Sequence, residues 1–523
     1  MRNRKKEFII ITIVLILQSI IFLTVGMNKS YIHMDEAYSL GLASYDKVEI
    51  QDNQDFYNNW HSKEYYEDYL IVNENEVGKY EQVYENQKND VHPPLYYLFL
   101  RIFMGFNKNS FSMWPGIILN IIIFLFITVF MYLILQKIFN NQTNSKEKAI
   151  ILSFISSITM SSLTNVIYIR MYALSSLNIL ITTYLHLKLL DTKKANIENL
   201  ILIGISALIG SLTHYYYLFY LAMLYILFAI KYIKEKNYKT LINYTLTMSI
   251  AGIVSLLIFP YSIQHMFFGY RGQGFISNLL NIPQFLNNIK DYLIKINTFV
   301  FNKLLFTILI IMALIAVILL IKKRKILKEK NKYMMYIILP TLFYFLLVSI
   351  ASPWIELRYV MPICSLIFVI VLYYSYNIIS NLFDEKKSNI IICILLIVIL
   401  VSPFVFNLQP EVAYADKKEI VEKLSTELNL PTLYLFNSQN NRFLDDILLF
   451  AKLEKSYIAK DIKCTEDNIK QILEKINTSK GLIIFINEGQ ENDELLNVIK
   501  KSTDLIKVTY LNRLNACDLY LVN

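Results

Sequence analysis

The sequence has little charge, little glycine and few cysteines. Of its 523 residues, 18% are charged, 13 are glycine and four are cysteine, whereas 55% are hydrophobic and the mean hydropathy is +0.40. Soluble globular domains carry about 25% charged residues, so this composition excludes an ordinary soluble protein. The cysteines show no close spacing, which excludes a CxxC metal or redox motif; they are Cys364, Cys393, Cys464 and Cys517.

The formal net charge of +9 could indicate a nucleic-acid partner. Binding of nucleic acid requires accessible stripes of Lys and Arg on a soluble surface. In this chain the basic residues stand between long apolar runs, so no nucleic-acid partner is expected. The composition instead predicts a polytopic α-helical membrane protein.

Eleven apolar runs are long enough, or nearly so, to cross a bilayer. The first follows the basic N-terminus without a small-residue cleavage site, so we interpret it as an uncleaved transmembrane helix. The segment from Pro93 to Phe106 is apolar but too short to span, and we expect it to lie in the interface as a helix. The eleven runs cover about 8–25, 113–137, 149–166, 173–190, 199–213, 215–231, 242–262, 300–321, 334–352, 356–378 and 390–406.

The charges orient these runs. With a cytoplasmic N-terminus, the cytoplasmic segments sum to +15 and the outer solvent-facing segments to −13. This agrees with the positive-inside rule and predicts a multi-pass protein of the cell membrane whose C-terminal tail is extracytoplasmic. The remaining +7 lies near the outer membrane face and includes Arg101, Arg170, Arg271 and Arg358.

The tail, residues 408–523, changes character. Helical patterns at about 416–428, 442–455, 465–478 and 491–503 alternate with β-rich runs at 432–436, 482–486, 507–510 and 519–522. This alternation predicts a small extracytoplasmic α/β domain with a mostly parallel sheet. We therefore divide the chain into a transmembrane domain, 1–406, with residues 31–91 as its first extracytoplasmic loop, and an α/β domain, 408–523.

Asp35 and Glu36 follow the first apolar run directly, in the sequence Tyr31-Ile-His-Met-Asp-Glu-Ala-Tyr-Ser-Leu40. In a loop with 14 acidic residues they could be solvated charge. Their apolar and aromatic surroundings close to the bilayer would instead raise a carboxyl pKa by desolvation, which suits a general base. Asp35 and Glu36 are therefore the candidate catalytic residues.

Further candidates gather near the predicted outer ends of the runs. His92 begins a His-Pro-Pro-Leu-Tyr-Tyr segment, and Arg170, His214, Arg271 and Arg358 are isolated cations. Each cation could simply extend to the interface. Together, on the face that the positive-inside tendency leaves poor in cations, they favour a phosphate-binding role, because Arg pairs well with phosphate oxygens.

These motifs, in order, resemble a known family. The Asp-Glu pair after the first run, His-Pro-Pro-Leu-Tyr-Tyr, Arg170-Met-Tyr, Thr-His214-Tyr and Arg358-Tyr are similar to those of bacterial GT-C-fold membrane glycosyltransferases, relatives of the protein O-mannosyltransferases and of the lipid A aminoarabinose transferases. The resemblance covers about residues 7–406. Relatives often place a carboxylate two residues before the Arg of Arg-Met-Tyr, where this chain has Tyr168, which leaves the partner of Arg170 open.

The resemblance implies a polyprenyl-phosphate-linked sugar as donor, an acceptor hydroxyl on a protein, wall polymer or lipid, and inversion at the anomeric carbon. Asp35 would be the base, Glu36 would orient the acceptor or the donor sugar, and His92 and Arg170 would face the phosphate, with Arg271 and Arg358 as further candidates. No cofactor is implied, although His33, Asp35 and Glu36 leave a divalent metal as an alternative. Candidates for contacting sugar or isoprenoid, which could equally be interfacial belt residues, are Tyr38, Tyr96, Tyr172, His214 and Tyr359.

Three other classes remain as alternatives. A transporter should show charged residues or Gly/Pro breaks inside paired runs, and often an internal repeat. The runs here are almost free of charged residues at their middle, and no internal repeat is found. A lipid-linked-sugar polymerase or ligase usually places its large loop late in the chain, whereas the long loop here follows the first run. A membrane anchor that presents the α/β tail would have no use for the Asp-Glu and His-Pro-Pro segments. The sequence identifies neither the sugar nor the acceptor.

Overall fold

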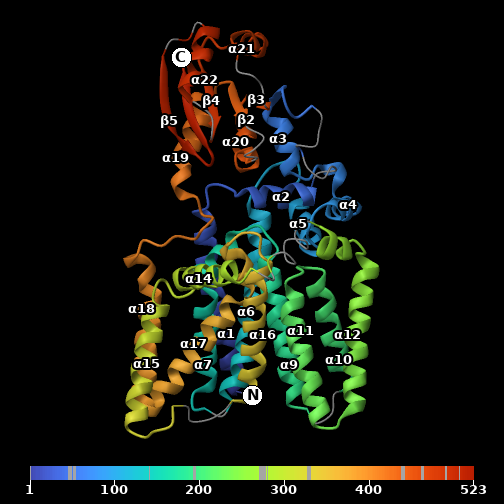
Figure 1. Ribbon diagram of the computed structural model, residues 1–523, viewed down its shortest axis with the longest axis vertical. Coiled ribbons are helices and arrows are strands. Elements are labelled where there is room, and N and C mark those ends of the chain that lie inside the picture. Colours follow the sequence, from blue (N-terminus) through green and yellow to red (C-terminus); the bar gives the residue numbers. More distant parts are fainter. Residues whose placement is uncertain are drawn as a thin grey trace. The chain divides into compact units, whose positions relative to one another are not determined.

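The computed structural model consists mainly of helices, with one six-stranded sheet (Figure 1). It divides into two compact units. Unit 1 comprises residues 1–26, 90–96 and 117–411, and unit 2 comprises 27–89, 97–116 and 412–523. The described residues are 2–523 except 45–49, 51–54, 141, 193–195, 270–277, 279–280, 327–330, 437–441, 461–464, 489–491, 504 and 506.

Unit 1 is a helical bundle of a membrane protein. In the described part of the chain, eight helices are long and apolar enough to cross a membrane. Each coincides with an apolar run of the sequence, because about 20 apolar residues in helical conformation match the thickness of the hydrocarbon core. The eight are α1 (Arg2–Met27), α6 (Trp114–Phe139), α9 (Tyr172–Leu190), α11 (Tyr217–Lys234), α12 (Tyr238–Ile258), α16 (Lys332–Ala351), α17 (Met361–Leu382) and α18 (Glu385–Val405).

The other three apolar runs are also helical but are bent or short. The run at 149–166 forms α7 (Ser145–Ser157) and α8 (Met160–Ile167), which meet at an angle of 58°. The remaining two form α10 (Ile197–Ser211), with 15 residues, and α15 (Leu305–Ile321), with 17. Eleven crossings therefore remain a prediction, whereas the helical nature of every run is confirmed.

Helix α14 (Ile282–Phe299) was not predicted from the sequence, because its apolar residues are interrupted by Asn, Lys and Asp. Figure 1 shows it lying across the direction of the long helices of unit 1. The π-helical turn η3 (Gln264–Phe268) and the 3-10 turn η4 (Leu357–Tyr359) also lie in the connections of this unit.

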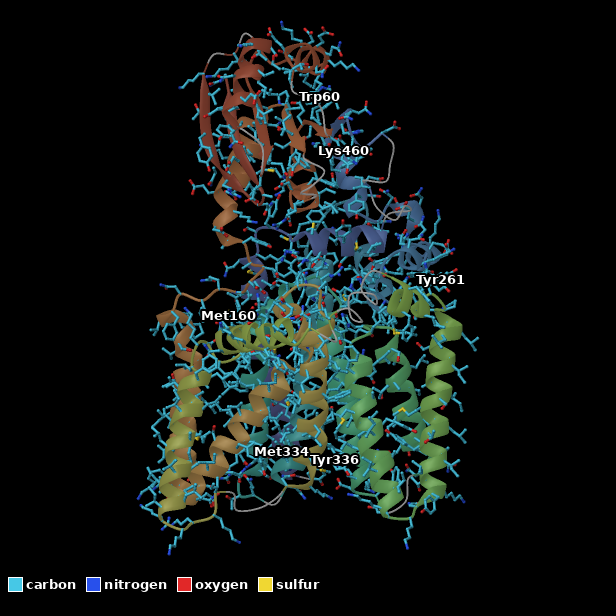
Figure 2. All side chains as sticks on the ribbon, viewed as in Figure 1. Trp60, Met160, Tyr261, Met334, Tyr336 and Lys460 are labelled. Carbon is cyan, nitrogen blue, oxygen red and sulfur yellow. The ribbon has the colours of Figure 1, made fainter. Side chains whose placement is uncertain are left out.

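Unit 1 has two chemically different ends. Figure 2 places Met160 and Tyr261 toward one end and Met334 and Tyr336 toward the other. The connections before α9, between α10 and α11 and before α17 are at the first end, here called the site end, and they contain Arg170, His214 and Arg358. The described lysines after α15, which are Lys322, Lys323 and Lys325, are at the opposite end.

Unit 2 contains the sheet, whose strand order is β1-β3-β2-β4-β6-β5. The β3–β2 and β2–β4 pairs are parallel, but the β1–β3, β4–β6 and β6–β5 pairs are antiparallel. The predicted mostly parallel sheet is therefore wrong. Parallel neighbours need a long crossover, and the last two strands are joined by a tight turn at Asn515. The strands are β1 (Trp60–Ser62), β2 (Thr432–Phe436), β3 (Lys455–Lys460), β4 (Leu482–Asn487), β5 (Val508–Leu514) and β6 (Cys517–Val522).

Strand β1 comes from the first loop, not from the tail, and extends the sheet by pairing with β3. The loop that the sequence division grouped with residues 1–406 thus shares a compact unit with the α/β tail. Helices α21 (Glu466–Leu473) and α22 (Asn492–Ser502) contribute residues to the core of this sheet, and unit 2 contains further helices and turns. These include α2 (Met34–Ser44), α3 (Lys63–Leu70), η2 (Glu74–Glu76), α4 (Glu81–Asn89), η5 (Ala415–Lys417), α19 (Lys418–Glu422), η6 (Lys423–Leu428), η7 (Phe443–Asp445) and α20 (Ile447–Phe450).

Two sequence-predicted helices have different outcomes. The short helix expected over 93–106 is present as α5 (Leu95–Gly105), most of which belongs to unit 2. The helix expected over 442–455 is instead the turn η7, the short α20 and the start of β3. Residues 456–459 of β3 are buried, and the strand pairs with β1 on one side and β2 on the other, although the sequence predicted no strand here.

Candidate functional site

Asp35 lies in the first turn of α2, and this turn is capped completely. The N–H of His33 donates to Glu36 Oε2 (2.8 Å), and the N–H of Asp35 donates to His33 Nδ1 (3.1 Å). The N–H of Met34 donates to Asp445 Oδ1 (2.9 Å). The first N–H groups of a helix lack partners within the helix. Here side chains supply them, so the position of Asp35 is fixed by its neighbours.

The two adjacent carboxylates have different environments. The side chain of Glu36 is 0% exposed, and its Oε2 also accepts from Lys29 Nζ (2.9 Å). The side chain of Asp35 is 17% exposed, beside the His33 ring at 3.6 Å. Glu36 is therefore committed to holding α2, while Asp35 is the carboxylate that reaches the surface.

Lys29 is as deeply buried as Glu36, and its Nζ also donates to the carbonyl oxygen of Val412 (2.9 Å). Burial lowers the pKa of Lys29, and the Glu36 carboxylate opposes that shift. We expect Lys29→Met to destabilise the protein by about 3–5 kcal/mol, because it removes the buried cation that compensates the charge of the Glu36 carboxylate. The measurement is the free energy of unfolding in detergent. Lys29→Met combined with Glu36→Gln should recover much of the loss; equal losses in the single and double variants would contradict the pairing.

Arg101 holds the opposite end of α2. Its guanidinium is buried and donates to the carbonyl oxygens of Ala43 (2.9 Å) and Ser44 (3.0 Å), which end the helix. It also donates to Gln82 Oε1 (2.7 Å). A cation is favourable at a helix C-terminus. The sequence grouped Arg101 with the outer cations that could bind an anion, and the structure shows instead that it caps α2.

Next to the first turn of α2 lies a group of four ionisable residues and one amide, here called the Asp445 cluster: Asp445, Asp446, Lys417, Arg442 and Asn515. Arg442 donates to Asp445 Oδ2 from Nε (2.9 Å) and Nη2 (2.8 Å). Asn515 Nδ2 donates to Asp446 Oδ1 (2.6 Å), and Lys417 contacts the side chain of Asn515. Burial, together with the neighbouring Asp445 carboxylate, raises the pKa of Asp446 well above its ordinary value.

This pKa shift predicts a pH dependence of stability. A carboxyl whose pKa is raised by folding stabilises the folded state at low pH, and this contribution is lost as the pH rises from the ordinary carboxyl range through the raised value. Asp446→Asn stays neutral and keeps an oxygen for Asn515. Its midpoint of thermal unfolding should therefore rise relative to that of the wild type as the pH increases above the ordinary carboxyl pKa of about 4. A difference that does not change with pH would contradict this assignment.

Unit 1 brings five of the sequence-predicted residues together at the site end. The ring centroids of His92 and His214 are 6.1 Å apart, and those of His214 and Tyr172 are 5.5 Å apart. Tyr172 lies edge-on to Tyr359 at 6.2 Å, and the Arg358 guanidinium lies over the Tyr359 ring at 5.1 Å. These five residues, here called the His92 cluster, come from four separate parts of the chain: the connection before α5, the first residue of α9, the turn between α10 and α11, and η4.

Local structure places each member of the His92 cluster. His214 stands in the turn between α10 and α11, where its N–H donates to the Gly210 carbonyl (3.2 Å). A Cβ at Gly210 would lie 2.3 Å from the Tyr217 ring, so glycine allows the two helices to approach this closely. Arg358 lies in η4, just before α17. The Nδ1 atom of His92 is hydrogen-bonded to Asp90 Oδ2 (2.8 Å).

Tyr168 stands where relatives often have a carboxylate, and its hydroxyl accepts from Arg358 Nη1 (3.3 Å). The Tyr168 and Tyr172 rings are stacked at 6.0 Å. Glu411 supplies the acidic group near Arg358, and burial raises the pKa of Glu411 while the Lys295 ammonium, 3.5 Å away, opposes the shift. Lys295 also contacts Glu356 (3.3 Å). The site end therefore contains both cations, Lys295 and Arg358, and carboxylates, Glu356 and Glu411.

An apolar pocket of about 280 Å³ adjoins the His92 cluster. Its walls include Leu218, Phe219 and Phe267, and three histidines lie on its lining: His92, His214 and His265. His265 Nδ1 lies 2.9 Å from the Tyr215 hydroxyl. His265 was not selected from the sequence. It is one of only six histidines in the chain and comes just after the apolar run at 242–262, and these two features could have marked it as a candidate.

The remaining sequence-predicted residues have separate positions. Arg170 is buried in the connection between α8 and α9, two residues before Tyr172 of the His92 cluster. Tyr96 is buried, and its hydroxyl donates to Asn120 Oδ1 (3.3 Å). Tyr38 lies half-buried on α2. Arg271 lies outside the described residues.

No group of three His, Cys, Asp or Glu side chains with metal-binding geometry occurs among the residues that the structure describes. His33 and Asp35 are adjacent, but Glu36 is turned toward Lys29. The described residues therefore do not assemble the His33, Asp35 and Glu36 metal site left as an alternative by the sequence.

Comparison with known proteins shows the fold. No family model and no curated protein sequence matches the chain. Among solved structures, ArnT from Cupriavidus metallidurans bound to undecaprenyl phosphate is similar, with a TM-score of 0.51 and 7% identity over 98% of this chain and 97% of that one. The same enzyme in the apo state gives a TM-score of 0.50 and 9% identity over 97% of each chain.

The likeness covers nearly the full length of both chains, so it includes the membrane bundle and the α/β tail. ArnT is a lipid A aminoarabinose transferase with the GT-C fold. The expected GT-C-like membrane fold with a C-terminal α/β domain is thus confirmed.

Proposed function

We propose that this protein transfers a sugar from a polyprenyl-phosphate donor to an acceptor hydroxyl, with inversion at the anomeric carbon. The observation that carries the proposal is the combination, at the site end of unit 1, of Arg358 and His92 with an apolar pocket of about 280 Å³. A phosphate on an isoprenoid chain needs both features. The fold shared with ArnT, which binds undecaprenyl phosphate, supports the same donor class.

The proposed role of Asp35 is that of general base. Its carboxylate takes the proton of the acceptor hydroxyl while the acceptor oxygen attacks the anomeric carbon. The bond from that carbon to the phosphate oxygen breaks, and polyprenyl phosphate leaves as an anion. Asp35 then releases the proton to water. Glu36 and Asp445 act as positioning residues, because they hold the turn that carries Asp35.

The proposed role of the His92 cluster is to bind the leaving phosphate. Charge develops on the phosphate oxygen as the glycosidic bond breaks, and fixed cations or donors lower the barrier most where charge develops. Arg358 is oriented by Tyr168 and Tyr359, so its donors need little rearrangement. His92 and His214 add donors beside the ring of Tyr172, which offers a flat surface to the sugar or isoprenoid. Arg170 and Arg271 remain candidates for the same phosphate.

The proposed membrane orientation follows from the charges. A cytoplasmic N-terminus places the lysine-rich segment before α16 inside and the site end of unit 1 outside. Transfer would therefore occur on the outer face of the cell membrane, with the α/β tail extracytoplasmic.

The experiment that tests the function uses the purified protein with a panel of polyprenyl-phosphate sugars. We expect at least one donor to release polyprenyl phosphate, faster in the presence of a hydroxyl acceptor. Absence of release from every donor, in protein with a normal unfolding midpoint, would contradict the proposal and favour a transporter or an anchor.

A further inference from the structure

A second pocket, of about 640 Å³, lies in unit 2 at the edge of the sheet, between β1 and α21. Figure 2 shows Trp60, which lines it, on the segment that leads into α3. Pockets of this size accept small ligands or parts of larger ones. Its lining includes Asn58, Asn59, Trp60, Tyr457, Asn468 and Gln471.

Two aromatic rings form one wall of this pocket. Trp60 and Tyr457 are directly opposite each other in the β1–β3 pair, with ring centroids 5.4 Å apart and planes at 57°. The indole N–H of Trp60 donates to the carbonyl oxygen of Ile472 (2.9 Å), which fixes the ring. The ring is only partly buried, so the wall offers a fixed apolar surface to a ligand.

Polar side chains form the other walls. Asn468, Gln471 and Lys475 follow one another at helical spacing, so they line one face of α21 and the turn after it. Asn58 and Asn59 lie on the loop before β1, and Asn58 is held there by the N–H of Lys460, which donates to its Oδ1 (3.1 Å). No carboxylate lines the pocket within the described residues, and Lys475 is the one cation.

This combination matches the chemistry of a saccharide. The carboxamide of Asn or Gln offers both donors and an acceptor, as sugar hydroxyls require. The C–H faces of a sugar ring are apolar and pack against aromatic rings such as Trp60. A phosphate would instead need several cations or Arg forks, which this pocket lacks.

We propose that the pocket binds an oligosaccharide segment of the acceptor, so that the acceptor of the transfer is a glycan chain or a glycan-bearing polymer. The inference rests on the proposed function and narrows its acceptor. Helix α3 separates the pocket from α2, since its first residue follows β1 and its end contacts α2 through Ser44 Oγ and the Tyr69 carbonyl (3.0 Å). Eight helical residues span about 12 Å, so the pocket holds a part of the acceptor distant from the reacting hydroxyl.

The binding test uses the full-length protein in detergent with soluble chitotetraose, cellotetraose, maltotetraose and mannotetraose. We expect at least one tetrasaccharide to bind by calorimetry and to change tryptophan fluorescence, and Trp60→Phe to remove the fluorescence change. Asn468→Ala combined with Gln471→Ala should weaken binding by about tenfold. Asn512→Ala, an exposed amide on β5, is the matched control and should bind as the wild type does.

Trp60 packs against the core of the sheet, so truncation to alanine could unfold the edge, and the amide variants therefore decide the outcome. Binding of no tetrasaccharide, or equal affinity in the double variant and the control, overturns the inference. With a glycan acceptor, the double variant should raise the acceptor KM more than it lowers kcat. A wild type that consumes no donor refutes the proposed function while saccharide binding still stands; a wild type that transfers sugar with an unchanged KM in the double variant refutes the saccharide pocket alone.

Discussion

We expect Asp35→Asn to lower the rate of the proposed sugar transfer by about 10²–10⁴-fold, the usual contribution of a general base. The amide cannot take a proton from the acceptor hydroxyl, but it has nearly the same shape as the carboxylate. The backbone hydrogen bonds of the first turn of α2 use Glu36, His33 and Asp445, so the variant should fold normally. The measurement is kcat for transfer, alongside the midpoint of thermal unfolding.

The matched control is Asp55→Asn, which changes an exposed carboxylate of the same loop. We expect wild-type turnover from this variant. Normal transfer by Asp35→Asn would remove Asp35 from the mechanism, whereas equal losses in both variants would point to a general effect of charge in the loop.

Arg358→Ala lowers kcat/KM for the donor by about 10²–10³-fold, as expected when a preorganised donor to a developing negative charge is removed. Arg358 is held over the Tyr359 ring and by the Tyr168 hydroxyl, and the neighbouring Glu411 would be left without this cation. Arg358→Lys keeps the charge but loses the planar fork, so its activity should fall between those of the wild type and the alanine variant.

Arg324→Ala is the control for Arg358→Ala. Arg324 is exposed, follows α15 at the end of unit 1 opposite the site end, and donates to the Asn381 carbonyl (3.2 Å). Its removal should leave donor kinetics unchanged. An Arg358→Ala variant with wild-type kcat/KM would exclude Arg358 from phosphate binding and leave Arg170 and Arg271 as the candidates.

The sequence predicted the helical bundle well because membrane helices are specified locally. About 20 apolar residues in succession can satisfy their backbone only as a helix in lipid, so every apolar run is a helix in the structure. Strands β2 and β4 were predicted for a similar reason, since short β-branched runs bounded by turns are local signals.

The arrangement of the sheet could not be predicted in this way. Strand β1 is three residues long and pairs with β3 from the other end of the chain, and no local pattern encodes such a pairing. Strand β3 lies almost wholly between two predicted helices, at about 442–455 and 465–478, where the sequence predicted no strand. The antiparallel β5–β6 hairpin required recognition of a tight turn at Asn515, whose φ is 51°.

In the candidate site, too, some residues could be predicted from local motifs and others could not. His92, Tyr172, His214, Arg358 and Tyr359 were selected from separate motifs, and the structure brings them together. The partners that fix α2 were not predictable. Asp445 lies 411 residues from Met34, whose N–H it accepts, and Lys29 and Arg101 resemble ordinary interfacial cations in the sequence.

The most direct test follows the sugar itself. The purified protein is given a polyprenyl-phosphate sugar labelled at the anomeric carbon, together with a hydroxyl acceptor, and the product is examined by NMR. We predict that the label moves from lipid to acceptor with inverted anomeric configuration, since in the proposed mechanism Asp35 activates the acceptor for a single displacement. A label that stays on the lipid for every donor, or a product with retained configuration, would contradict this account.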